Sequence, residues 1–154
     1  MDLSDLIEVS AVMPTLKANS KKQLLQLLAE KAATVTGLAE REIFDTILQR
    51  ERLGSTGVGN GIAIPHGKLP GIRKITGVFA RLDTPVDFEA LDDQPVDLVF
   101  LLLAPESAGA DHLKALSRIA RVLRDPETVS KIRGSNDATA IYTFLAQTPA
   151  SHAA

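Results

Sequence analysis

The stretch VDLVFLLLA, residues 96–104, is the longest apolar run in the chain and decides the class of fold. It contains one charged residue, Asp97, and is far shorter than the roughly 20 residues that a membrane-spanning helix needs. A short and continuously apolar run is typical of a strand that is buried on both faces of its sheet. We therefore predict that residues 97–104 form a central strand.

Two stretches upstream show the same strand-like character. GIAIPH, residues 61–66, and ITGVFARL, residues 75–82, are brief and apolar, and Gly, Pro or Asp lies at their boundaries. Short apolar segments with such boundaries are typical of strands. We therefore predict that both belong to the same sheet as residues 97–104, with His66 at the end of its strand.

Helical periodicity occurs on both sides of these strands. A first helix is predicted after Ser20, which forms a capping-box pattern with Gln23, and it should end at Gly37. Further helices are predicted over residues 39–53, over residues 110–125 with Asp111 as the cap, and over residues 137–147. The expected apolar stripes of the first three helices are Leu24, Leu27, Leu28, Lys31 and Val35; Ile43, Phe44 and Ile47; and Leu113, Leu116, Ile119, Ala120 and Leu123. This arrangement favours a single layered α/β domain with helices packed on a sheet.

The composition excludes several classes of site and partner. A chain of 154 residues is long enough for one domain with its own core, and the absence of cysteine excludes disulfides and thiolate metal sites. A net charge of −2 with scattered Lys and Arg disfavours nucleic-acid binding. The N-terminus shows no signal-peptide pattern, so we expect a cytoplasmic protein that does not insert into a membrane. The domain is expected over residues 1–148, followed by a flexible tail over residues 149–154.

Six glycines between residues 54 and 71 predict an irregular loop whose backbone can approach a ligand closely. The loop is not a nucleotide-binding motif. Ile62 stands where the dinucleotide fingerprint requires its third glycine, and Leu69 stands where a P-loop carries Ser or Thr. The chain also lacks the esterase nucleophile elbow and the usual spacing of metal-binding histidines, so neither a cofactor nor a metal is expected.

His66 is the residue of this loop that is best suited to chemistry. Pro65 favours an extended chain before it, and Gly67 allows the chain to turn away after it, so the imidazole should be presented rather than packed. Near neutral pH one ring nitrogen of a histidine is unprotonated and nucleophilic. Such a nitrogen can attack phosphorus and hold a phosphoryl group covalently. The alternative is an ordinary core histidine that only satisfies a hydrogen bond.

The segment RERLGSTGVGNGIAIPHGKLPGI, residues 50–72, resembles the active-site signature of the mannitol/fructose-type IIA domains of the bacterial phosphoenolpyruvate:sugar phosphotransferase system. The similarity extends through DLVFLLLAPES and DHLKALSRIARVLRD, and it is greatest to the nitrogen-regulatory branch. The resemblance implies a mixed sheet flanked by helices. It also implies that Nε2 of His66 accepts a phosphoryl group from the phosphohistidine of an HPr-like carrier, which in the nitrogen branch is NPr.

The resemblance implies roles for the residues around His66 as well. Arg50 matches an arginine that lies beside the phosphoryl group, and His112 matches a second histidine that faces the first. Asn60 is a departure from the pattern, because mannitol-type relatives carry a glutamate there, and this favours the regulatory branch. The expected phosphoryl-binding loop consists of Ser55, Thr56, Asn60 and Gly67.

Three functions are open at this point. The first is a phosphocarrier that controls target proteins through its phosphorylation state. The second is the IIA component of a fructose- or mannitol-type sugar transporter, which passes phosphate to a IIB domain, and the third is a binding module that no longer carries phosphate. Glu51 and Arg52, which follow Arg50 in the chain, are expected to lie on a solvent-exposed face of the helix.

Overall fold

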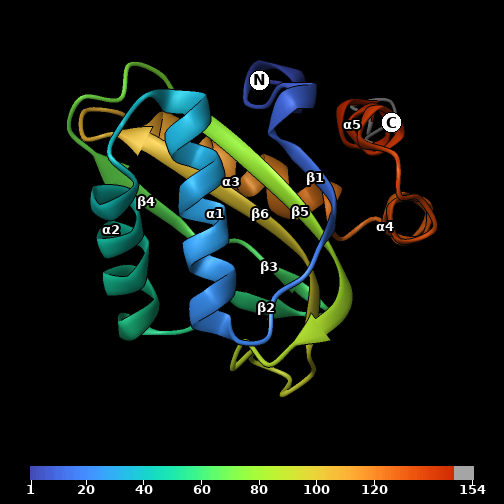
Figure 1. Cartoon of the computed structure of the whole chain (residues 1–154). Helices are drawn as coiled ribbons and strands as arrows, with labels where there is room; N and C mark the ends of the chain where they lie inside the picture. The colour runs from blue at the N-terminus through green and yellow to red at the C-terminus, as the bar shows by residue number, and fades with distance from the viewer. Residues whose placement is uncertain (148–154) are drawn as a thin grey trace.

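A mixed six-stranded sheet runs through the computed structural model, which describes residues 1–147 (Figure 1). Its strands are β1 (Val12–Leu16), β2 (Gly57–Gly59), β3 (Ile62–Ala63), β4 (His66–Leu69), β5 (Thr76–Val86) and β6 (Val96–Pro105). The order across the sheet is β1-β5-β6-β3-β2, and β4 also pairs with β6. The tail predicted over residues 149–154 lies outside the described residues.

Strand β6 is the centre of the sheet, as its apolar sequence predicts. It pairs antiparallel with β5 on one side and parallel with both β3 and β4 on the other. Val96 and all residues from Leu98 to Ala104 are at most 1% exposed. A strand that is covered on both faces cannot carry alternating polar residues, which explains the unbroken apolar run.

Helices α1 (Lys21–Thr36) and α2 (Glu40–Leu53) cover one face of this sheet, and α3 (Ala110–Val122) lies on the other (Figure 1). The predicted start and stop of α1 are confirmed, because the Ser20 hydroxyl accepts a hydrogen bond from the Gln23 backbone N–H and Gly37 adopts a φ of 78°. The buried side of α1 is centred differently from the predicted stripe: Leu27, Lys31 and Val35 are only half-buried. Its buried residues are Leu24, Leu25, Leu28, Ala29 and Ala32.

Helix α3 presents a different face to the sheet than its leucines suggest. Leu113, predicted as a core residue, is 70% exposed, and the buried positions are His112, Ala115, Ile119 and Val122. The prediction of Asp111 as the cap is also wrong, because the cap position is occupied by Gly109 and Asp111 lies within the first turn. Helix α3 is thus rotated about its axis relative to the predicted orientation, so that His112 is buried and Leu113 lies on the surface.

Several elements were not predicted from the sequence. They are the 3-10 helices Leu3–Asp5 and Val9–Ala11, strands β1 and β2, and helix α4 (Pro126–Arg133). The last helix, α5 (Ala138–Ala146), lies within the predicted range of residues 137–147, is capped by Asp137 and packs against β1 at the sheet edge. Among residues 1–147, none of the helices combines the length and the apolar character that crossing a membrane requires.

Candidate functional site

His66 opens strand β4 rather than ending the strand before it. Strand β3 stops at Ala63, and the chain passes through Ile64 and Pro65 before pairing resumes with His66 opposite Leu102 of β6. The carbonyl of Pro65 accepts a hydrogen bond from the Leu102 N–H at 2.9 Å. The backbone of His66 is therefore fixed by hydrogen bonds to the central strand of the sheet.

Gly67 does not form the sharp turn that was predicted for it. The chain continues through it as part of β4, and Gly67 pairs with Leu103. A Cβ atom at this position would lie 2.7 Å from Cγ2 of Thr46, which is closer than real contacts allow. Glycine is therefore required because helix α2 approaches β4 closely, and this contact brings the C-terminal half of α2 beside His66.

The imidazole of His66 is held in one orientation. Its Nδ1 lies 2.8 Å from the carbonyl oxygen of Ile64, so Nδ1–H donates to that oxygen and Nε2 carries the free lone pair. Burial lowers the pKa of His66 below its ordinary value of 6.5; the Ile64 hydrogen bond opposes this, and the Arg50 guanidinium adds to the lowering. The ring is consequently neutral near pH 7, with a nucleophilic nitrogen of defined direction.

His112 meets the His66 ring edge to face. The two ring centroids are 5.6 Å apart and the ring planes are inclined by 87°. Only 6% of His112 is exposed, yet neither of its ring nitrogens has a hydrogen-bond partner among the described residues. Burial lowers the pKa of His112, and the charges of His66 and Lys68 lower it further. A buried polar group without a partner is uncommon and points to a ligand that completes it.

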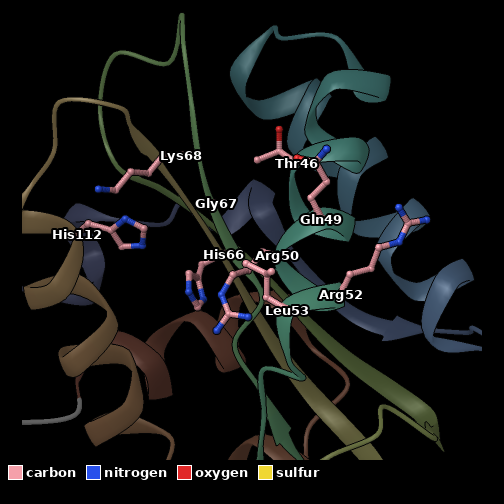
Figure 2. A pocket seen from close by; sticks show the side chains of 9 residues that line it. All are labelled: Thr46, Gln49, Arg50, Arg52, Leu53, His66, Gly67, Lys68 and His112. Carbon is pink, nitrogen blue, oxygen red and sulfur yellow. The ribbon is translucent and has the colours of Figure 1, made fainter.

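A cavity of about 530 Å³ opens in front of the two rings (Figure 2). Besides the predicted Arg50, its lining includes the cations Lys68 and Arg52, and the Arg52 guanidinium points away from His66 (Figure 2). The full lining is Thr46, Gln49, Arg50, Arg52, Leu53, His66, Gly67, Lys68 and His112. An opening with this charge and two imidazoles is suited to a phosphoryl group.

Helix α2 supplies most of this lining through one of its faces. Positions 46, 49, 50 and 53 are separated by three or four residues, which places them on the same side of a helix. Arg50 is further fixed because its Nη1 donates a hydrogen bond of 2.9 Å to the Gly54 carbonyl just beyond the helix. The helical spacing from Arg50 was the signal that could have identified Thr46, Gln49 and Leu53 from the sequence.

The comparisons with known proteins agree with this geometry. The family model described as phosphoenolpyruvate-dependent sugar phosphotransferase system, EIIA 2, matches residues 5–148. The chain belongs to this family. A nitrogen regulatory protein of Bradyrhizobium diazoefficiens is 63% identical over 153 residues, which are 99% of this chain and 100% of that protein.

Two further relatives of this EIIA 2 chain are informative. The crystal structure of the nitrogen regulatory protein IIA-Ntr from Neisseria meningitidis superimposes with a TM-score of 0.88 at 33% identity, covering 93% of this chain and 98% of that one. The fructose-specific EIIA component of Haloferax volcanii is 31% identical over 147 residues, or 95% of this chain and 96% of that protein. The predicted fold class, a mixed sheet flanked by helices, is confirmed.

Three predicted loop residues of the EIIA 2 signature lie outside the cavity lining. The Ser55 hydroxyl donates to the Phe88 carbonyl at 2.8 Å, and the Thr56 hydroxyl donates to the Glu51 carboxylate. Asn60 occupies the tight turn between β2 and β3 with a φ of 58°. Its backbone N–H donates to the Asp92 carboxylate at 3.0 Å, and its carbonyl accepts a hydrogen bond of 2.6 Å from Nη2 of Arg133. The hydrogen bonds of all three residues fix the shape of the loop.

Near the candidate site, the predicted environment of Glu51 was wrong. It is only 6% exposed, not solvated, whereas its neighbour Arg52 is exposed as expected. Its position continues the buried stripe of Ile43 and Ile47 at intervals of four residues, and this spacing was the available signal. The buried carboxylate lies directly beneath the loop that leads from α2 to β2.

Proposed function

We propose that this EIIA 2 chain is a phosphocarrier in which Nε2 of His66 accepts a phosphoryl group from the phosphohistidine of an HPr-like carrier protein, NPr in the nitrogen branch. The observation that supports this most directly is the hydrogen bond between His66 Nδ1–H and the Ile64 carbonyl. It fixes the tautomer in which Nε2 is unprotonated, and the cavity with Arg50, Arg52 and Lys68 lies in front of the ring. No cofactor is needed for this chemistry.

The transfer is a displacement at phosphorus. The lone pair of His66 Nε2 forms a new N–P bond while the N–P bond of the donor phosphohistidine breaks, and its electron pair returns to the donor imidazole. The His66 ring becomes positive as the bond forms, and the Ile64 carbonyl that accepts Nδ1–H stabilises this charge. The phosphorylated enzyme intermediate makes the protein a phosphotransferase component in the enzymatic sense.

The neighbouring groups stabilise the phosphoryl oxygens. Arg50 is fixed by its bond to Gly54 and retains further N–H groups for the oxygens, and Lys68 adds a second positive charge. His112 supplies a ring N–H that has no partner in the described protein, so donating it to a phosphoryl oxygen satisfies the buried group. Stabilisation by such preorganised donors is usually the largest contribution to a transfer of this kind.

The output of the site is a change of surface charge. A phosphoryl group adds almost two negative charges to a cavity with a basic lining, and this offsets most of the local positive charge. Target proteins that bind the unmodified opening are therefore expected to bind the phosphorylated form differently. The relative of Bradyrhizobium diazoefficiens is named as a nitrogen regulatory protein, which supports a regulatory output for this chain.

The test is phosphorylation of the purified full chain with phosphoenolpyruvate, enzyme I and an HPr-like carrier. We expect acid-labile, base-stable phosphate on the wild-type protein and only background labelling of His66→Ala. The chain has three histidines, and His152→Ala serves as the matched control that should be labelled fully. Labelling of His66→Ala at the wild-type level would contradict the proposal.

A second candidate function is supported by the fructose-specific relative of Haloferax volcanii. In that case the chain would pass the phosphoryl group on to a sugar-specific IIB domain instead of controlling target proteins. Incubating the phosphorylated chain with a fructose-type IIB domain distinguishes the two functions. Rapid transfer of label to IIB would favour the transporter component, and retention of label would favour the regulatory carrier.

A further inference from the structure

Glu51 forms a buried link between helix α1, helix α2 and the loop behind the candidate site. Its Oε1 lies 3.0 Å from Nζ of Lys21, at the start of α1, and accepts the backbone N–H of Thr56 at 3.1 Å. Its Oε2 accepts the hydroxyl of Thr56. Both carboxylate oxygens therefore have partners. The hydrogen bonds from Thr56 to Glu51 connect the two ends of the segment 51–56, which contains the C-terminal end of α2.

This arrangement is costly for a purely structural link. Removing a carboxylate and an ammonium from water carries a large penalty, and apolar residues of similar size often stabilise a fold equally well. An apolar residue would also continue the stripe of Ile43 and Ile47. The retention of a charge at position 51 is explained if the charge itself acts on a neighbouring group.

The group of the candidate site on which the charge of Glu51 acts is the His66 imidazole. The charged and titratable groups that face it are Arg50 from α2, Lys68 from β4 and His112 from α3. Arg50 makes the ring nitrogens less basic, whereas Glu51 acts in the opposite direction and raises the pKa of His66. Glu51 also lies close in the chain to Gly54, whose carbonyl accepts the hydrogen bond from the Arg50 guanidinium.

We propose that Glu51 is a positioning residue for phosphoryl transfer, which fixes the turn that carries Arg50 and whose negative charge maintains the nucleophilicity of Nε2 of His66. This inference rests on the proposed function. The arginine that stabilises the phosphoryl group also withdraws electron density from the nucleophile by its charge. A buried carboxylate behind the arginine compensates for this without competing for the phosphoryl group, because both its oxygens are already bonded.

Glu51→Gln tests the charge, because the amide keeps the shape and can still accept from Thr56. Lys21 retains Glu89 at 3.5 Å and the Phe88 ring at 4.6 Å, so the fold should persist. We expect the pKa of His66, followed by NMR titration of the ring nitrogens, to be lower than in the wild type. Phosphoryl acceptance should also be slower than in the wild type, because a less basic Nε2 is a weaker nucleophile.

The matched control is Glu89→Gln, which removes the other carboxylate that contacts Lys21. The Glu89 side chain is 77% exposed and is not among the charges that act on His66. We expect this variant to leave both the His66 titration and the rate unchanged. If Glu51→Gln leaves the titration of His66 where it is in the wild type, or if Glu89→Gln shifts it equally, the proposal is wrong.

Glu51→Asp separates position from charge and covers a failure of Glu51→Gln to fold. The shorter side chain keeps the negative charge but cannot reach both Thr56 and Lys21, so we expect a titration of His66 like that of the wild type together with slower acceptance. A rate equal to wild type would contradict the positioning role. Absence of labelling in the wild type itself would contradict the proposed function, whereas the titrations would still report on Glu51.

Discussion

The two ends of strand β6 carry polar clusters of opposite character. At the Asp97 end, Nε and Nη2 of Arg133 each donate to the Asp97 carboxylate at 2.9 Å, and Nη2 also reaches the Asn60 carbonyl at 2.6 Å. Arg81 then donates to the Arg133 carbonyl at 2.9 Å. At the Leu102 end, the buried His112 has two ring nitrogens without a partner in the described residues.

The difference separates polar groups that hold the fold from polar groups that serve a ligand. The Asp97 cluster connects α4, β5, β6 and the β2–β3 turn, and each of its hydrogen bonds closes between protein groups. An unpartnered buried polar group costs about 1–3 kcal/mol, so a fold does not retain one without a reason. This difference supports the proposal that phosphoryl transfer takes place at the His112 end of the strand.

The comparison of the two ends of β6 can be tested by substitution, and we expect the largest effect, on the rate of phosphoryl acceptance, for His112→Phe. A phenyl ring keeps the shape and the edge contact with His66 but removes the donor, so phosphoryl acceptance should fall by about 10²–10³-fold. The free energy of unfolding should be unchanged or higher, because an unsatisfied buried group has been removed. Rates of labelling and urea denaturation measure the two quantities.

The distinction between the two ends would be wrong if His112→Phe lowered the free energy of unfolding by as much as the loss of a buried hydrogen bond does. Such a loss would show that the His112 nitrogens contribute to the native state and are not reserved for a ligand. Normal labelling of the variant would likewise remove His112 from the proposed transfer.

An effect of intermediate size is expected at the opposite end, for Arg133→Met. This variant leaves the Asp97 carboxylate without its partner, and the free energy of unfolding should fall by about 2 kcal/mol in urea denaturation. Phosphoryl acceptance should not change. The control is Lys131→Met in the same helix, whose pair with Glu127 is exposed and should contribute about 0.5 kcal/mol or less. Equal losses in the two variants would contradict a specific structural role of the Asp97 cluster.

The apolar pattern of the sequence was sufficient for the centre of the fold. Strand β6 and the ends of α1 were predictable because burial on both faces and helix capping leave local signatures in the sequence. Leu113 and Glu51 were assigned wrongly because residue type was given more weight than position. Both errors concern helix faces, and for Glu51 the four-residue spacing from Ile43 and Ile47 indicated the correct face.

The assembly of the site was less accessible from the sequence. Local reasoning selected His66, but only the resemblance to a family connected it with Arg50 and His112. Their meeting depends on the pairing of β4 with β6 and on the close approach of α2 at Gly67, neither of which leaves a local signature. For the same reason the hydroxyls of Ser55 and Thr56, expected at the phosphoryl group, are bonded within the protein instead.

The smallest expected effect is the pH dependence of stability, and it also distinguishes the two ends. Burial lowers the pKa of both His66 and His112, so the unfolded chain binds more protons than the native protein as the pH falls through the ordinary histidine value of about 6.5. The free energy of unfolding should therefore decrease from pH 7.5 to pH 5.5. Urea denaturation of His112→Phe should show a shallower decrease, whereas Arg133→Met should keep the wild-type slope. A slope that changed in Arg133→Met but not in His112→Phe would contradict the assignment of this pH dependence to the two histidines.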